Sequence, residues 1–345
     1  MPLSSRFRAE PELPNGQAAT TGVLLCNLGT PDEPTPAAVR RYLRQFLSDP
    51  RVVEIPRAVW LPILYGLILP FRSSKSAAKY ATIWTPEGSP LKLWTQCQAL
   101  LLQGRLGEDG HRVKVRYAMR YGNPSIASQL DALKAEGATR ILVLTAYPQY
   151  SGTTTASVID DVADWARGAR NVPELRFVNR YHDDPGYIEA LARRIGAGWR
   201  EGGPPDHFVM SFHGVPERTM KLGDPYSSEC LTTARLLAGR LGLAEGDYTV
   251  AYQSRFGRAK WLEPYTEPTL RALAKKGVER VDVACPGFTS DCLETLEEIA
   301  QEGRDAFLAS GGKDFRYIPC LNGEPVWIRA LGDIAARHLA GWPTR

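Results

Sequence analysis

Three landmarks recur in the same order in the two halves of the sequence. The first is an apolar run that ends at a Gly-x-Pro turn. The second is an apolar run that ends at Arg-aromatic-Gly, and the third is a run that ends at a proline turn. They stand at 23–31, 115–122 and 140–151 in the first half, and at 208–216, 250–257 and 280–289 in the second. Chance rarely reproduces such an order, so the sequence predicts two structurally similar lobes.

Short apolar runs alternate with amphipathic stretches along both halves, which is typical of parallel sheets covered by helices on both faces. The run Gly202-Gly-Pro-Pro205 interrupts this alternation and marks a boundary between the halves. We therefore expect an α/β protein with one lobe at 21–200 and a second at 201–345. Residues 1–20 are polar and contain prolines, so we expect them to form a loose tail.

The first lobe contains an insertion that the second lacks. Its landmark glycines, Gly29 and Gly122, are 93 positions apart, whereas their counterparts are 43 apart, a difference of 50. The insertion, at about 50–100, includes the apolar stretch 55–72, which prolines interrupt and which is too short to span a bilayer. This stretch fits a core helix or an exposed apolar lip. Because an insertion is less often core than a shared element, we favour a lip over the mouth of a cleft.

A row of carboxylates follows the last landmark of the second lobe. The stretch 281–299 opens as an apolar strand, turns at Pro286-Gly287 and continues with helical spacing. Four carboxylates, spaced three, four and four residues apart, are expected on one helical face: Asp291, Glu294, Glu298 and Glu302. Most acidic helix faces are simply solvated. This row begins just after a strand, where open α/β sheets bind their ligands, which favours a role in handling a cation.

Two ionisable residues occupy positions where the first lobe has apolar ones. His213 aligns with Leu28, and Glu294 aligns with Ala156. A single histidine after a strand is more often structural than catalytic. An imidazole and carboxylates that meet at one crevice, however, offer metal ligands and proton acceptors together, so both residues are candidate functional groups.

Composition excludes several classes of function. The net charge of +4 is small and evenly spread, so no nucleic-acid partner is expected. The six cysteines include no Cys-x-x-Cys pair, which argues against a zinc ribbon or a ferredoxin-like site, and we expect reduced thiols of a cytosolic protein. Neither a GxGxxG nor a Walker loop follows the first strand of either lobe, so a nucleotide-binding enzyme is not indicated.

A set of motifs, in one order from about residue 22 to the end, resembles the ferrochelatase family. The motifs are Asn27-Leu-Gly-Thr-Pro31, Gly88-Ser-Pro-Leu91, Arg120-Tyr121, Tyr147-Pro-Gln-Tyr-Ser151, Ser211-Phe-His-Gly-Val-Pro216, Gly223-Asp-Pro-Tyr226, Tyr252-Gln-Ser254, Phe288-Thr-Ser-Asp-Cys-Leu-Glu-Thr295 and Leu321-Asn-Gly-Glu-Pro325. The His-Gly-x-Pro and Phe-Thr-Ser-Asp-x-x-Glu-Thr motifs are the most specific. Ferrochelatases insert ferrous iron into a porphyrin at the end of haem synthesis.

The resemblance implies two Rossmann-like lobes that hold a porphyrin in an active-site cleft between them. It assigns His213 and Glu294 to the metal ion and to the pyrrole protons. The residues it implies for the porphyrin pocket are Leu28, Arg120, Tyr121, Tyr150, Ser151 and Phe288. The acidic row, here Asp291, Glu298 and Glu302, would carry iron in or protons out.

The chemistry of this reaction agrees with the residues selected above. Metallating a porphyrin removes two N–H protons, so a base must lie over the ring centre. A ferrous ion needs ligands that hold it and also release it, which suits one imidazole and a carboxylate. We therefore expect insertion of Fe2+ into protoporphyrin IX to give protohaem and two protons. Iron and porphyrin are then substrates, and no cofactor is bound permanently.

Three positions depart from the family pattern. Cluster-bearing members have a cysteine where this chain has Gly152, and three more in a C-terminal tail beyond Arg345, so no iron–sulfur cluster is expected. Animal-type members have a histidine where this chain has Cys292. Cys292 fits the role of a structural thiol better than that of a metal ligand. Coproporphyrin-using relatives place a tyrosine where this chain has Leu28, and this difference favours protoporphyrin.

The sequence leaves two other functions open. One is a ferrochelatase for coproporphyrin III, and the other is a haem- or porphyrin-binding protein without chemistry. His213 and Glu294 argue against the second, because storage needs no proton acceptor. We expect a monomer rather than a dimer, in the cytoplasm, with peripheral contact between residues 55–72 and the inner face of the cytoplasmic membrane.

Overall fold

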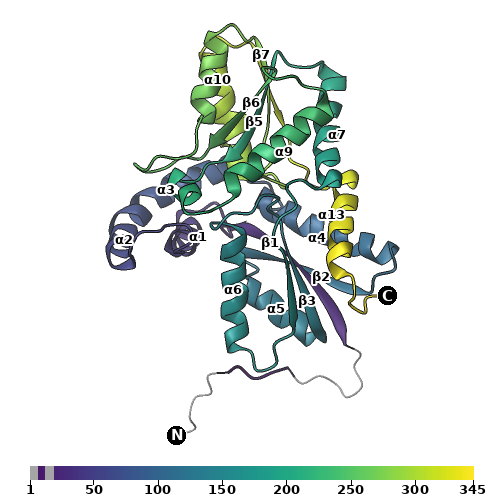
Figure 1. Cartoon of the computed structure of the whole chain (residues 1–345). Coiled ribbons are helices and arrows are strands. Elements are labelled where there is room, and N and C mark those ends of the chain that lie inside the picture. Colours follow the sequence, from purple (N-terminus) through teal and green to yellow (C-terminus); the bar gives the residue numbers. More distant parts are fainter. Residues whose placement is uncertain (1–6, 12–18) are drawn as a thin grey trace.

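Two α/β lobes make up the structure, a computed structural model that describes residues 7–11 and 19–345 (Figure 1). The first contains a parallel sheet of β2 (Val113–Gly122), β1 (Thr20–Thr30), β3 (Ala138–Thr145) and β4 (Glu174–Val178), in that order. The second contains β6 (Tyr248–Gln253), β5 (His207–His213), β7 (Arg280–Ala284) and β8 (Asp314–Ile318). The two orders are equivalent strand for strand, which confirms the predicted α/β fold with two similar lobes.

The helices follow the strands in the alternation that the sequence predicts. In the first half they are α1 (Pro36–Ser48), α2 (Arg57–Ile63), the π-helix η1 (Leu64–Ile68), α3 (Leu69–Ile83), α4 (Pro90–Glu108), α5 (Ile126–Ala135), α6 (Thr155–Gly168) and α7 (Pro185–Gly202). In the second half they are α8 (Glu217–Lys221), α9 (Tyr226–Leu241), α10 (Thr266–Lys275), α11 (Leu293–Leu296), the π-helix η2 (Glu298–Gly303), α12 (Arg304–Ala309) and α13 (Pro325–Leu339).

The central strands of both sheets are apolar runs with no exposed surface. Leu24 and Leu25 of β1 and Val209 and Met210 of β5 are all fully buried. Side chains alternate between the two faces of a strand, so an uninterrupted apolar run requires cover on both faces. Helices from each half supply this cover, and the sheets are therefore interior layers.

The last helix of each half packs on the other lobe. Trp199 of α7 stacks edge-on against Phe208 of β5, with ring centres 5.6 Å apart, and donates a hydrogen bond to Asp282 of β7. In the opposite direction, α13 packs against α4 and β3 of the first lobe. Arg176 of β4 donates to the carbonyl oxygen of His338 at the end of α13. The chain boundary near residue 203 therefore separates the two sheets, while the covering helices are exchanged.

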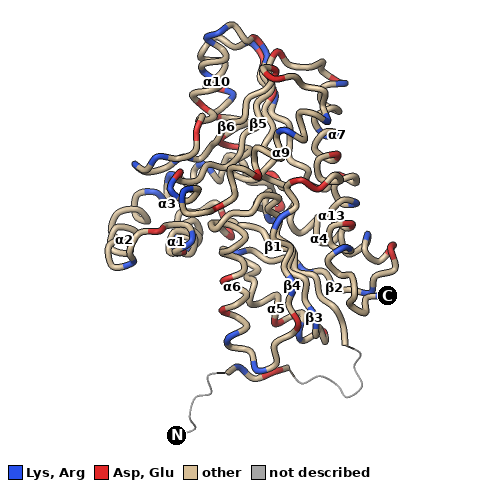
Figure 2. Tube along the Cα trace, in the orientation of Figure 1, with Lys and Arg blue, Asp and Glu red and all other residues tan. Residues whose placement is uncertain are grey.

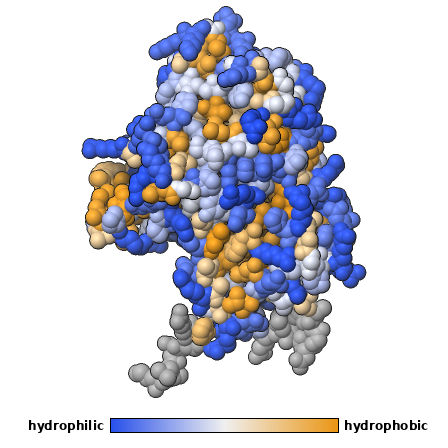
Figure 3. Space-filling model, in the orientation of Figure 1, coloured by the Kyte–Doolittle hydropathy of each residue, from blue (hydrophilic) through white to orange (hydrophobic). Residues whose placement is uncertain are grey.

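The insertion of the first lobe, at about 50–100, contains α2, η1, α3 and the first part of α4, and we refer to its residues 55–83 as the arm. Pro62 and Pro70 lie in the arm, and proline interrupts regular helical hydrogen bonding, which accounts for the broken sequence of α2, η1 and α3. Six apolar side chains of the arm are exposed: Ile55, Val59, Ile63, Tyr65, Leu67 and Phe71. They form the apolar surface over α2 in Figure 3, and basic positions surround α3 in Figure 2.

Several buried side chains attach the arm to the core. Leu64 has no exposed surface and Leu69 is 1% exposed, and both pack in a cluster with side chains of α1 and Tyr121. The arm thus combines exposed apolar side chains with buried anchors, and it is neither wholly core nor wholly lip. Among the residues that the structure describes, no helix is both long enough and apolar enough to cross a membrane.

Residues 7–11, the described part of the predicted loose tail, are fixed to the first lobe. The backbone N–H of Arg8 donates to the carbonyl oxygen of Gly168 over 2.9 Å. Glu10 accepts from the backbone N–H groups of Arg170 and Asn171. This short segment is therefore bound to the lobe, unlike the loose tail expected for residues 1–20. Most of the remaining tail lies outside the described residues.

Candidate active site

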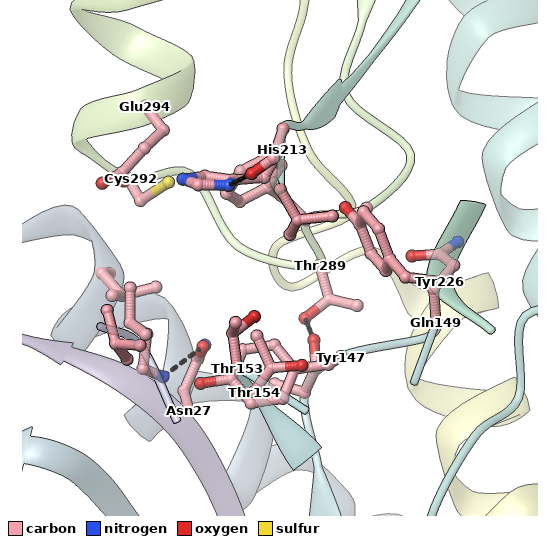
Figure 4. A pocket seen from close by; sticks show the side chains of 18 of the residues that line it. Asn27, Tyr147, Gln149, Thr153, Thr154, His213, Tyr226, Thr289, Cys292 and Glu294 are labelled. Atoms are coloured by element: carbon pink, nitrogen blue, oxygen red, sulfur yellow. Dashed lines mark hydrogen bonds between the residues drawn. The ribbon is translucent and has the colours of Figure 1, made fainter. Parts of the chain in front are cut away.

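A pocket lies between the lobes, where the carboxyl-terminal ends of β1, β3, β5 and β7 face one another (Figure 4). Its open volume, including the solvent at its mouth, is about 940 Å³. Most of its walls are apolar. The first lobe supplies Leu28, Phe46, Val52 and Leu91, and the second supplies Val215, Phe256, Trp261 and Phe288.

His213 is the last residue of β5, and its ring enters the pocket from the second lobe. Its Nδ1 lies 2.6 Å from the carbonyl oxygen of Gly214. A carbonyl oxygen only accepts hydrogen bonds, so Nδ1 carries a proton, and in the neutral imidazole Nε2 then presents a lone pair. Figure 4 shows this second nitrogen pointing toward Cys292 and Glu294. The imidazole is therefore oriented to accept a proton or to bind a metal ion.

The backbone after His213 passes close to the neighbouring strand. Gly214 donates its N–H to the carbonyl oxygen of Gln253, and a Cβ at position 214 would lie 2.7 Å from that oxygen. A glycine is required there because a larger residue would push the turn away from β6. The same turn carries the carbonyl that orients His213, so this close approach fixes the imidazole.

Two glutamates stand beside His213. Glu294, in the first turn of α11, lines the pocket. Glu298 accepts hydrogen bonds from the backbone N–H and the hydroxyl of Ser254, over 2.6 and 2.5 Å. Burial raises the pKa of Glu298 in spite of these bonds, and the nearby charge of Glu294 acts in the same direction. A carboxyl group with a raised pKa exchanges protons closer to neutral pH than an ordinary one.

The single acidic face predicted for four carboxylates does not form. The helix α11 is only four residues long, and Asp291 precedes it. Asp291 is buried and accepts hydrogen bonds from Tyr317, Asn322 and Thr295. Its carboxylate is therefore engaged in holding the turn before the helix, and it is absent from the pocket lining. The prediction was wrong at this position because spacing alone cannot tell where a helix begins.

The outer end of the acidic segment pairs with a lysine of the arm. Nζ of Lys79 lies 2.9 Å from Oε1 of Glu302 and 3.0 Å from the carboxylate of Glu297. Glu297 was not among the residues selected from the sequence, because it lies off the predicted face. Burial raises its pKa, and the Lys79 ammonium acts against that rise.

Cys292 lies in the pocket between the groups described above (Figure 4). Burial raises the pKa of its thiol well above the usual value, and the neighbouring Glu294 carboxylate adds to the effect. The thiol is therefore neutral, and it also caps the start of α11. Within the described part of the chain, no three His, Cys, Asp or Glu side chains are close enough to hold a metal ion by themselves.

Comparison with known proteins identifies the family. The family model for ferrochelatase matches residues 20–339, nearly the whole described chain. The chain belongs to the ferrochelatase family. The ferrochelatase of Polaromonas sp. (strain JS666 / ATCC BAA-500) is 67% identical over 343 residues, which cover 98% of this chain and 94% of the relative. The ferrochelatase of Methylibium petroleiphilum is 67% identical over 336 residues, covering 97% and 93%.

Solved structures resemble the fold at much lower sequence identity. SirB from Bacillus subtilis with Fe3+ superposes with a TM-score of 0.55 at 12% identity, covering 93% of this chain and 96% of SirB. CbiX, the terminal enzyme for the biosynthesis of siroheme in denitrifying bacteria, gives 0.51 at 14% identity, covering 92% and 100%. These likenesses support the two-lobed fold alone. Membership of the ferrochelatase family is what supports metal insertion into a porphyrin as the reaction.

Two of the six residues that the ferrochelatase resemblance implied for the porphyrin line the pocket. They are Leu28, on the first lobe, and Phe288, whose ring centre lies 6.4 Å from that of His213. Arg120, Tyr121, Tyr150 and Ser151 are absent from the pocket lining. The side chains of Arg120, Tyr121 and Ser151 and the backbone of Tyr150 instead hold other residues in place.

Arg120 and Tyr121 hold a buried carboxylate at the end of α1. Asp49 accepts hydrogen bonds from Ser157 (2.6 Å), Tyr121 (2.7 Å) and Arg120 (2.8 Å). Burial by itself would raise the pKa of Asp49, but the hydrogen bonds and the charge of Arg120 outweigh it, and the pKa is lowered from 3.8. This network fixes the loop that carries Val52 into the pocket.

Tyr150 and Ser151 connect the two lobes. The hydroxyl of Ser151 and the backbone N–H of Gly152 both donate to Asp224, over 3.0 and 2.7 Å. The N–H of Tyr150 donates to the buried carboxylate of Glu229 over 2.7 Å. Two acidic residues of the second lobe thus hold one turn of the first lobe, and that turn presents neighbouring side chains to the pocket.

Several pocket residues were not selected from the sequence. Gln149, Thr153 and Thr154 belong to or follow the Tyr-Pro-Gln-Tyr-Ser motif, and extending that motif in both directions could have found them. Phe256 and Trp261 line the pocket with their rings 4.9 Å apart. They lie in a polar loop without periodicity, and no local sequence signal places such a loop against a pocket.

The first prediction concerns the network behind the pocket wall. Asp49→Asn should lower the free energy of unfolding by about 3 kcal/mol at pH 7, because Arg120 then loses its buried partner. The lowered pKa means that the stabilisation by Asp49 is present above pH 3.8 and is lost as pH falls through the folded pKa. Urea unfolding at several pH values should therefore show a difference that shrinks in acid.

Asp160→Asn provides the matched control. Asp160 is paired with Arg51 at 2.7 Å, but its side chain is 48% exposed, so its loss should cost less than about 1 kcal/mol. Equal losses for the two variants, or a loss for Asp49→Asn that persists in acid, would contradict the role given to Asp49.

Proposed function

We propose that the chain inserts ferrous iron into protoporphyrin IX to form protohaem, with release of two protons. One observation carries the proposal: the free Nε2 of His213 and the carboxylate of Glu294 converge on one pocket whose walls are otherwise apolar. An apolar slot suits the face of a macrocycle, and the two polar groups supply what its centre requires. Iron and porphyrin are substrates in this reaction, and the membership of the ferrochelatase family supports both.

The site contains acceptors for the two pyrrole protons. Fe2+ replaces two N–H hydrogens, so the ring loses two protons for each ion gained. Nδ1 of His213 donates to the carbonyl oxygen of Gly214, and in the neutral imidazole Nε2 is then free to accept a proton or to ligate iron. Glu294 lines the same pocket, and Glu298, with its raised pKa, is suited to pass a proton onward. These three groups supply ligation and proton removal without a closed metal cage.

The apolar walls orient the macrocycle. Phe288 stands next to His213, and Leu28 faces the pocket from the opposite lobe. Contacts with the periphery of the ring supply binding energy away from the reacting nitrogens, and such energy can support distortion of the ring at its centre. Leu28 also favours protoporphyrin over coproporphyrin as the substrate. Coproporphyrin-using relatives have a tyrosine at this position, whereas the apolar side chain of Leu28 offers the metal ion no ligand from the first lobe.

A comparison of two porphyrins tests the substrate. We expect kcat/KM for iron insertion to be higher with protoporphyrin IX than with coproporphyrin III, measured from the absorbance of the haem product under anaerobic conditions. Leu28→Tyr should narrow the difference, because it introduces the hydroxyl found in coproporphyrin-using relatives. A preference for coproporphyrin III in the parent would overturn the choice of substrate and leave metal insertion standing.

Replacement of His213 tests the reaction itself. His213→Ala should lower kcat by about 10²–10⁴-fold, the usual contribution of a positioned acid–base group. Porphyrin binding, followed by fluorescence quenching, should stay near the parent value because the apolar walls remain. His207→Ala, at the other end of β5, is the control and should retain activity. Metallation by His213→Ala at the parent rate would assign the chemistry elsewhere and favour a porphyrin-binding protein.

We also propose that the chain acts as a monomer in the cytoplasm without a resident iron–sulfur cluster. Gly152 supplies no thiolate, and its backbone N–H is bound to Asp224. A Cβ at that position would lie 3.3 Å from the Asp224 carboxylate, so a cysteine there would have to shift that carboxylate slightly.

The exposed apolar side chains of the arm support peripheral contact with a membrane. Val59, Leu67 and Phe71 are 56%, 55% and 67% exposed, and Arg57 and Arg72 flank them. Apolar side chains that enter the acyl boundary, together with arginines near anionic headgroups, are the usual elements of such contact. A porphyrin of low solubility could then move between the membrane and the pocket.

Vesicle pelleting tests this contact. The triple variant Val59→Ser, Leu67→Ser, Phe71→Ser should bind anionic vesicles at least tenfold more weakly, because each buried apolar side chain contributes about 1.5–3 kcal/mol. Its thermal stability should stay near the parent value. Leu64→Ser is the contrasting variant: its fully buried side chain should make it a stability mutant, with a loss of about 2–5 kcal/mol. Undiminished pelleting of the triple variant would contradict the contact.

A further inference from the structure

Glu297 and Glu302, the outer carboxylates of the acidic segment, are already paired with a lysine. Lys79 of α3 places its ammonium 3.0 Å from the carboxylate of Glu297 and 2.9 Å from Oε1 of Glu302. Glu297 is nearly buried, with 9% of its side chain exposed, whereas Glu302 is 55% exposed. The lysine thus joins a buried carboxylate to one at the surface.

The ammonium is held by packing as well as by charge. Lys79 precedes Tyr80, a buried residue of the cluster that anchors the arm, and Leu293 and Leu296 of α11 pack against the same cluster. Thr82, one turn further along α3, accepts a hydrogen bond from Gln301 of η2 over 3.4 Å. The contact crosses between lobes, so the position of Lys79 depends on how the arm lies on the second lobe.

The four glutamates form a connected path of negative charge. Glu294 lies in the pocket, Gln253 donates both to the Glu294 carbonyl oxygen and to the Glu298 carboxylate, and Lys79 joins Glu297 to Glu302. A divalent cation that follows carboxylates from solvent to the pocket meets Glu302 and Glu297 first. There the cation must either displace the Lys79 ammonium or share the two carboxylates with it.

We propose that Lys79 competes with divalent cations, the ferrous substrate included, for Glu297 and Glu302. The inference rests on the proposed function, in which the carboxylates serve the cation. With the ammonium in place, Glu297, Glu302 and Lys79 together carry one net negative charge. This group therefore binds weakly attracted or abundant ions less tightly than two unpaired carboxylates would. Ferrous iron then passes to His213 and Glu294, where the ligand set includes an imidazole. Lys79 therefore lowers the affinity of the outer pair for divalent cations, so that ions do not accumulate there.

Direct cation binding tests the proposal without the reaction. Mn2+ binding to the porphyrin-free protein, followed by electron paramagnetic resonance, should be about three- to tenfold tighter for Lys79→Met, because one unit charge a few ångströms away is removed. The side-chain stem remains, so packing is preserved. KM for Fe2+ should fall by a similar factor, KM for porphyrin should be unchanged, and inhibition by Mn2+ should become stronger.

Two further variants complete the test. Lys75→Met, one turn earlier on the exposed side of α3, should match the parent in every measurement. Lys79→Arg keeps the charge and should retain parent-like Mn2+ affinity, which also guards against a folding defect in Lys79→Met. Unchanged or weaker Mn2+ binding in a folded Lys79→Met would overturn the proposal and leave Lys79 as a clamp between lobes. A parent that binds Mn2+ but metallates no porphyrin would refute the proposed function instead.

Discussion

Parallel hydrogen bonding in both sheets is the constraint on which the site depends. All the strand pairs that join the eight strands are parallel, so the residues that follow the strands collect at one edge of each sheet. The two edges face each other across the pocket, which brings Leu28 opposite His213. The apolar wall and the polar groups therefore come from equivalent positions of two similar lobes. One copy could keep packing residues while the other acquired an imidazole and carboxylates.

The sequence predicted the architecture because the signals were local and repeated. Apolar runs, proline turns and helical spacing act over a few residues, and the repeat provided an internal check on each of them. The same comparison singled out His213 and Glu294, since their counterparts are apolar. The structure brings both into one pocket, and the ferrochelatase family confirms the suspected relationship.

The remainder depended on partners far apart in the chain. Arg120 and Tyr121 matched a family motif, yet they bind Asp49, 71 and 72 positions away, behind the pocket wall. Asp291 had the right spacing but is held by Tyr317 from the neighbouring strand. Lys79 and Glu297 are 218 positions apart. A one-dimensional pattern shows which face a side chain occupies, but it does not show what lies opposite that face.

The exchange of α7 and α13 has a consequence for how the protein is made. The first lobe contains all four of its strands by residue 178, but part of its cover is α13, near the end of the chain. During synthesis from the N-terminus, that apolar face stays open until almost the whole polypeptide has left the ribosome. A nascent chain arrested between the lobes would therefore expose a sheet surface suited to chaperone binding. Two separately expressed halves would each lack a helix that the other carries.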